Sequence, residues 1–139
     1  MKKLNLLLIL SSIILNINSQ PIEFNYICPV PDSRYINPEQ VIILKTGYIF
    51  DPQSLRHAFT ILKGTESGNM LSTMSLSADL KTLFIHPGSK FTLGERVFVY
   101  ISPGLKTMEG KNIGSTSFEF YIRDPRPAPL PVAAGILNP

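Results

Sequence analysis

The chain has 139 residues, with 13 Lys and Arg against 10 Asp and Glu, and a formal net charge of +3. Lys2 and Lys3 belong to a predicted leader, and without them 11 basic residues face 10 acidic ones, a net charge of +1. The remaining basic residues are spread singly, whereas binding to a phosphate backbone needs a cluster on one face. The composition therefore excludes a nucleic-acid-binding protein.

Residues 1–19 have the layout of a secretory signal peptide. A short basic start precedes an apolar run over residues 4–15, and polar residues then lead to Pro21. A membrane anchor needs about 20 apolar residues, and this run is shorter. We therefore predict export, cleavage near Ser19 or Gln20, and a secreted or cell-surface protein with no membrane segment in its mature form.

Cys28 is the only cysteine of the chain. An exported chain with one cysteine cannot form an internal disulfide, so burial of an apolar core must stabilise it. We interpret Cys28 as a small buried side chain on the first strand. The alternative is a thiol that pairs with a cysteine of a partner or of a continuation of the chain. A lipid anchor is disfavoured because Cys28 lies well beyond the apolar run.

Short runs rich in β-branched and aromatic residues are separated by turn residues throughout residues 25–123. A polar loop is expected up to Gly68, and Asp51 is expected to cap one helical turn that begins at Pro52. In chain order, the predicted strands are residues 26–31, 41–45, 59–63, 70–77, 82–86, 97–102 and 117–122.

The strands at residues 97–102 and 117–122 show the clearest period of two. Val97, Val99 and Ile101 alternate with Phe98 and Tyr100, so the first three are predicted to face the core. No long segment with a period of 3.6 follows the leader, which excludes helical and doubly wound folds. The predicted fold class is all-β, an antiparallel β-sandwich of about seven strands.

From residue 124 the composition changes to a proline-rich segment that ends at residue 139. Spaced prolines favour an extended, semi-rigid spacer. We therefore predict that the chain is the N-terminal part of a longer secreted protein. A short protein with a frayed tail and a proline-rich ligand for a partner domain remain as alternatives.

The sandwich region resembles the bacterial Ig-like domains of the SbsA and Big_5 type. The resemblance covers nearly all of residues 26–123, and the order and spacing of its motifs carry it. These motifs are CPVPDSRY at 28–35, VIILK at 41–45, FDPQSL at 50–55, LSADLKTLFIHP at 76–87, FTLGE at 91–95 and GLKTMEGK at 104–111.

The resemblance implies a non-catalytic Ig-like module that acts as a spacer, docking or adhesion domain. Such domains often form the first module of secreted or surface proteins. Two other functions stay open: an accessory domain of a larger extracellular enzyme, and a carbohydrate-binding sandwich.

No catalytic, metal or cofactor site is predicted. His57 and His86 lie in separate segments without a second ligand at metal spacing, and we expect His86 to be solvated or locally bonded. No nucleophile-elbow motif supports a Ser-His-Asp triad. Asp51 and Asp79 lie in turns, where they are expected to bond nearby backbone, and no Asp-x-Asp run indicates calcium.

Phe98 and Tyr100 are the candidate interaction surface. With Val97, Val99 and Ile101 facing inward, both aromatic side chains must face outward on a middle strand. An exposed aromatic pair is typical of a docking patch for a glycan or a protein at the cell surface. The alternative is that a neighbouring loop or domain covers both rings.

Overall fold

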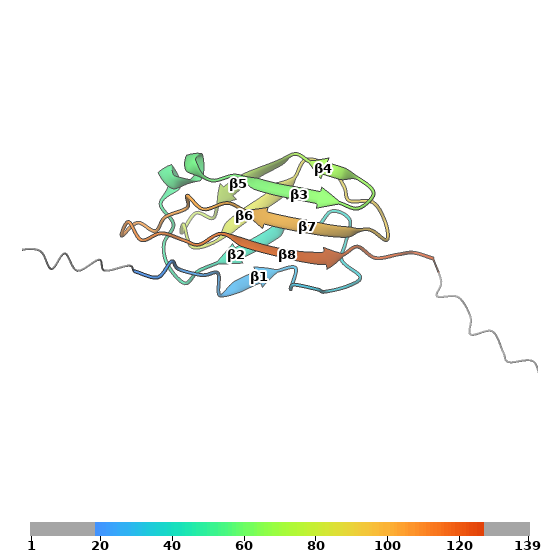
Figure 1. Ribbon diagram of the computed structural model, residues 1–139, viewed down its shortest axis with the longest axis horizontal. Helices are drawn as coiled ribbons and strands as arrows, with labels where there is room; N and C mark the ends of the chain where they lie inside the picture. The colour runs from blue at the N-terminus through green and yellow to red at the C-terminus, as the bar shows by residue number, and fades with distance from the viewer. Residues whose placement is uncertain (1–18, 127–139) are drawn as a thin grey trace, which may run out of the picture.

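Two four-stranded sheets stack face to face in the computed structural model, which describes residues 19–126 (Figure 1). The first sheet has the order β1-β2-β6-β5 and the second the order β4-β3-β7-β8, and every pairing between these strands is antiparallel. The predicted all-β sandwich is therefore confirmed. The strands are β1 (Tyr26–Cys28), β2 (Ile42–Lys45), β3 (Thr60–Gly64), β4 (Gly68–Met70), β5 (Ser72–Leu76), β6 (Leu83–Pro87), β7 (Arg96–Ile101) and β8 (Thr116–Tyr121).

The predicted single strand at residues 70–77 is wrong, because these residues form parts of two strands, β4 and β5, that belong to different sheets. β4 begins at Gly68, within the predicted polar loop, and it pairs with β3 as a tight hairpin. The predicted signal peptide, residues 1–19, and the predicted linker, residues 124–139, lie almost entirely outside the described residues. The boundaries of the domain therefore stay predictions.

β7 and β8 have the orientation that their alternation predicts. Val97, Val99 and Ile101 are fully buried, and Phe118 and Phe120 point into the same layer from the neighbouring strand. Successive side chains of a strand point to opposite faces of the sheet. The opposite set of each strand therefore lies on the outer face of the second sheet.

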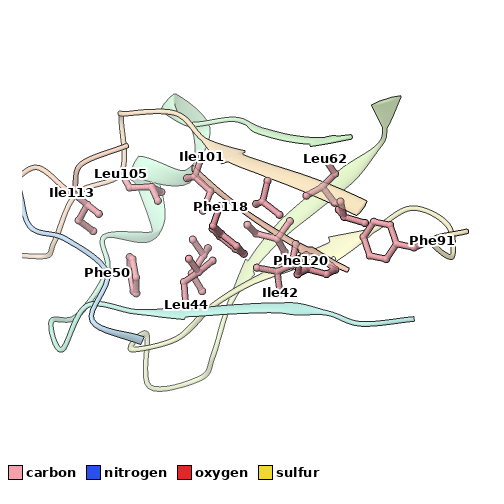
Figure 2. Close-up of a cluster of buried hydrophobic side chains, with 14 of the residues drawn as sticks. Ile42, Leu44, Phe50, Leu62, Phe91, Ile101, Leu105, Ile113, Phe118 and Phe120 are labelled. Carbon is pink, nitrogen blue, oxygen red and sulfur yellow. The ribbon is translucent and has the colours of Figure 1, made fainter. Parts of the chain in front are cut away.

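One apolar core fills the space between the sheets. Figure 2 shows its side chains in a row that runs from Ile113 and Phe50 to Phe91. Phe91 meets Phe120 edge to face, with ring centroids 5.7 Å apart, a favourable arrangement for two aromatic rings. Leu105 and Ile113 come from the connection between β7 and β8, so this connection is part of the core and not only a turn.

The chain moves from the first sheet to the second after β1. β1 is an edge strand, as its flanking prolines predicted. The following segment, residues 32–36, lies along β8: the N–H of Asp32 donates to the carbonyl of Glu119 at 2.7 Å, and the N–H of Tyr121 donates to the carbonyl of Ser33 at 2.9 Å. These bonds cover the edge of the second sheet.

The predicted helical turn is present as the 3-10 helix η1 (Pro52–His57). Asp51 caps it, because its Oδ1 accepts from the N–H of Gln53 at 2.9 Å. The buried Ser54 hydroxyl accepts from the N–H of Lys106 at 3.0 Å, which attaches η1 to the connection between β7 and β8.

Glu95 is a buried carboxylate, 1% exposed, directly before β7. Its Oε2 accepts from the N–H groups of Glu66 at 3.0 Å and Ser67 at 2.9 Å, and its Oε1 accepts from the N–H of Thr92 at 2.6 Å and from the hydroxyl of Ser67. Gly64 makes room for it, since a Cβ there would lie 2.1 Å from Oε2. Glu95 therefore fastens the β3–β4 hairpin to the start of β7.

Two opposing effects act on the pKa of Glu95. Burial raises the pKa, and it is the largest single effect, but the hydrogen bonds from Ser67, Glu66 and Thr92 together outweigh it. The pKa therefore lies below its ordinary value, and the ionised form is the one that the fold stabilises.

We predict that Glu95→Gln lowers the free energy of unfolding by about 2–3 kcal/mol, because the amide cannot accept all the bonds that the carboxylate accepts. Urea denaturation of the two proteins at neutral pH measures the loss. Glu66→Gln is the matched control, since the exposed Glu66 reaches Glu95 only through its backbone N–H, and its effect should stay within about 0.5 kcal/mol.

The same pair of proteins gives a pH test. Because the pKa of Glu95 is lowered in the folded state, its stabilisation is complete above the unfolded pKa and is lost as the pH falls through the folded pKa. The stability difference between the natural chain and Glu95→Gln should therefore shrink below about pH 4.5. A difference that stays constant down to pH 3 would contradict the role given to the ionised carboxylate.

Candidate functional site

The outer face of the second sheet carries a group of exposed or half-buried apolar side chains, which we call the aromatic face: Phe59, Ile61, Phe98 and Tyr100. Ile61 on β3 lies opposite Tyr100 on β7, and Phe98 is two residues from Tyr100 on the same strand. Phe59 is 57% exposed and Phe98 is 41% exposed. Both residues predicted as an interaction surface thus lie on the outer face.

Phe98 lies in a cleft of about 630 Å³ at one end of this face. The β3–β4 hairpin that Glu95 holds forms one wall of the cleft, and β7 and β8 form its floor. The lining residues are Lys63, Gly64, Thr65, Glu66, Gly68, Arg96, Phe98 and Glu119.

The charges around Phe98 balance each other. In the strand register, Phe98 lies between Lys63 on β3 and Glu119 on β8. Arg96 Nη1 lies 3.7 Å from Glu119 Oε2, and Glu66 adds a second carboxylate to the lining. The cleft therefore offers hydrogen-bond donors and acceptors beside an aromatic ring, without a net charge.

Tyr100 has different surroundings. Its ring lies against that of Phe59, with centroids 6.1 Å apart and planes tilted by 56°. It is half-buried and is not part of the lining of the cleft. The structure thus places Phe98 and Tyr100 on one face but brings only Phe98 to the cleft.

The residues of β3 and β8 that lie beside Phe98 on the outer face were not identified from the sequence. The alternation of Phe59, Ile61 and Lys63 with the buried Leu62 was a usable signal for the outer face of β3. The position of Glu119 beside Phe98 depends on the pairing of β7 with β8, which the sequence does not state.

The histidines and the two turn carboxylates lie outside this site. His86 is exposed on β6, and its Nε2 lies 3.0 Å from the hydroxyl of Ser75, which confirms the expectation of a locally bonded imidazole. Asp51 caps η1. Asp79 accepts from the N–H of Lys81 at 3.1 Å and from Ser77, which confirms its local backbone role.

Cys28 is not a core residue, which corrects the expectation of a buried side chain. It is half-buried on β1, opposite Ile43, while the neighbouring Ile27 is the residue that packs against the core. Sequence spacing could not decide this, because a three-residue strand has no alternation long enough to distinguish its two faces.

Within residues 19–126, no group of three or more His, Cys, Asp and Glu side chains is arranged to hold a metal ion. The same residues contain no helix long and apolar enough to cross a membrane.

No protein-family model matches the chain, and no curated protein matches it in sequence. Solved structures do share its fold. PcoC, a copper resistance protein from Escherichia coli, superposes with a TM-score of 0.57 at 16% identity, over 72% of this chain and 98% of PcoC. CopC from Methylosinus trichosporium OB3b gives 0.56 at 10% identity, over 76% and 96% of the two chains.

Domains 1–6 of the surface layer protein SbsC also match, with a TM-score of 0.54 at 18% identity. The match covers 79% of this chain and 15% of the SbsC chain, so it involves a small part of a much longer protein. At these identities the likeness establishes a shared β-sandwich fold.

We predict that Phe98 can be removed without loss of the fold, whereas Phe120 on the neighbouring strand cannot. Phe120→Ala should lower the free energy of unfolding by about 3–5 kcal/mol, because it leaves a cavity in the core. Phe98→Ala should change it by less than about 1 kcal/mol. Chemical denaturation measures both, and equal losses would show that Phe98 is not a surface residue.

Proposed function

We propose that this chain is a secreted, non-catalytic Ig-like module of the SbsA and Big_5 type, and that its cleft at Phe98 docks a neutral glycan at the cell surface. The observation that carries the proposal is an exposed aromatic ring inside a cleft whose charged lining is balanced.

A sugar ring has an apolar C–H face and a rim of hydroxyl groups that both donate and accept. The exposed face of Phe98 is suited to the apolar side of such a ring. Lys63 and Arg96 can donate to hydroxyls, while Glu66 and Glu119 can accept from them. A lining of two cations and two carboxylates has no net charge with which to select an ionic ligand.

The positions of the two ends support a second role, that of an accessory module within a larger protein. Ile22 forms a bridge with Ile113, beyond the end of β7, whereas the carbonyl of Arg123 accepts from Gly94, before β7 begins. The described chain therefore enters and leaves at opposite ends of the sandwich (Figure 1). Such a module can lie in line between an N-terminus and a following domain.

The docking role predicts that the mature chain binds neutral oligosaccharides on a glycan array, and that Phe98→Ala weakens this binding by about 10-fold through the loss of aromatic stacking. Phe59→Ala is the matched control, because Phe59 is an exposed ring of the same face outside the cleft. Its affinity should stay within about twofold of the natural chain. Binding to anionic glycans alone, or equal losses in both variants, would contradict a neutral ligand at this cleft.

Export predicts a defined N-terminus. The protein recovered outside the cytoplasm of the cells that produce it should begin near Gln20 when its terminal residues are sequenced. An unprocessed chain that begins at Met1 would contradict the signal peptide. The intact mass of the same protein distinguishes a free-standing module from a module that is joined to further domains.

A further inference from the structure

β5 is an edge strand whose outer backbone groups have no partner among residues 19–126. The N–H of Gly88 donates to the carbonyl of Leu71 at 2.7 Å, and the N–H of Ser77 donates to the carbonyl of Thr82 at 2.9 Å. In an antiparallel ladder the bonded positions alternate. Thr73 and Ser75 therefore also bond to β6, while the N–H and C=O groups of Ser72, Met74 and Leu76 point away from the sheet.

The other edges of the sandwich are protected. Residues 32–36 cover β8 with hydrogen bonds. β1 and β4 have three residues each, and Pro29 directly follows β1. Short edges, prolines and covering segments are the usual means by which proteins prevent strand addition.

β5 lacks such protection. Residues 67–78 contain no charged residue and no proline, and Leu71, directly before the strand, is 87% exposed. A five-residue edge strand without charge is a template for pairing with another strand. In Figure 1, β4 and β5 lie on the side of the sandwich opposite β1 and β8. The segment that covers the edge of β8 is therefore on the other side of the molecule from β5.

We propose that β5 pairs with β5 of a second copy of this chain, antiparallel and centred on Met74. This register places Ser72 opposite the partner's Leu76 and Met74 opposite the partner's Met74. It uses the outward N–H and C=O groups of all three residues, since each directly opposed pair exchanges two hydrogen bonds. The first sheets of the two copies then form one continuous sheet.

The side chains of β5 are complementary to themselves in this register. On the outer face, Thr73 lies opposite the partner's Ser75, a pairing of hydroxyl side chains that can bond across strands. On the inner side, Met74 and Leu76 are half-buried at the edge of the core and gain cover from the partner strand. No like charges meet, which favours a second copy over a charged partner strand.

The test is sedimentation equilibrium of the mature chain up to about 1 mM, with two double variants. Thr73→Lys with Ser75→Lys brings like charges opposite each other across the interface and should raise the dimer dissociation constant at least about 10-fold. Thr73→Lys with Ser75→Glu brings opposite charges together at the same positions and should keep the dimer. Both variants lose the contact of Ser75 with His86, so this change in the monomer is common to the two.

A mature chain that stays monomeric over the whole range would overturn the proposal. So would a dimer that both double variants leave unchanged, because it would then use another surface. If a chain ending at Arg126 dimerises and the mature chain does not, residues 127–139 occupy the edge and the proposal is wrong. The Phe98→Ala variant should dimerise as the natural chain does. A failure of the glycan-docking proposal would therefore not affect the result of the dimer test.

Discussion

The fold depends on the packing of two inner sheet faces against each other, since a chain with a single cysteine has no covalent link across its core. Both sheets contribute fully buried aliphatic side chains, such as Leu44 from β2 and Val99 from β7. The connections take part as well, because Phe50 and Leu105 extend the core beyond the strands. This packing sets the direction of every side chain in the strands, and with it the composition of the outer faces.

Glu95 links the stability of the sandwich to the shape of its cleft. Its carboxylate holds the backbone of Glu66 and Ser67, and this hairpin is the wall beside Phe98. A buried carboxylate is tolerated only when its oxygens accept hydrogen bonds. The two oxygens of Glu95 accept four of them. The hairpin side of the cleft is thus held by one internal polar cluster and not by contacts among the surface residues themselves.

The two surfaces for which we propose roles lie on different sheets. The cleft at Phe98 belongs to the outer face of β3, β7 and β8, whereas the open edge belongs to β5 in the other sheet. Docking and self-association would therefore not compete. A pair of copies joined through β5 would present two clefts, and two linked weak sites bind a repetitive ligand more tightly than one site does.

The sequence by itself determined the all-β class, most strands and the inward set Val97, Val99 and Ile101, because a two-residue period is a local property that the chain carries without its partners. It also predicted that Phe98 and Tyr100 face outward. Only the tertiary structure decided that Phe98 enters a cleft while Tyr100 packs on Phe59, and that Glu95 is buried. These features depend on strand pairs that are distant along the chain, and register between such strands is set by packing across the whole sandwich.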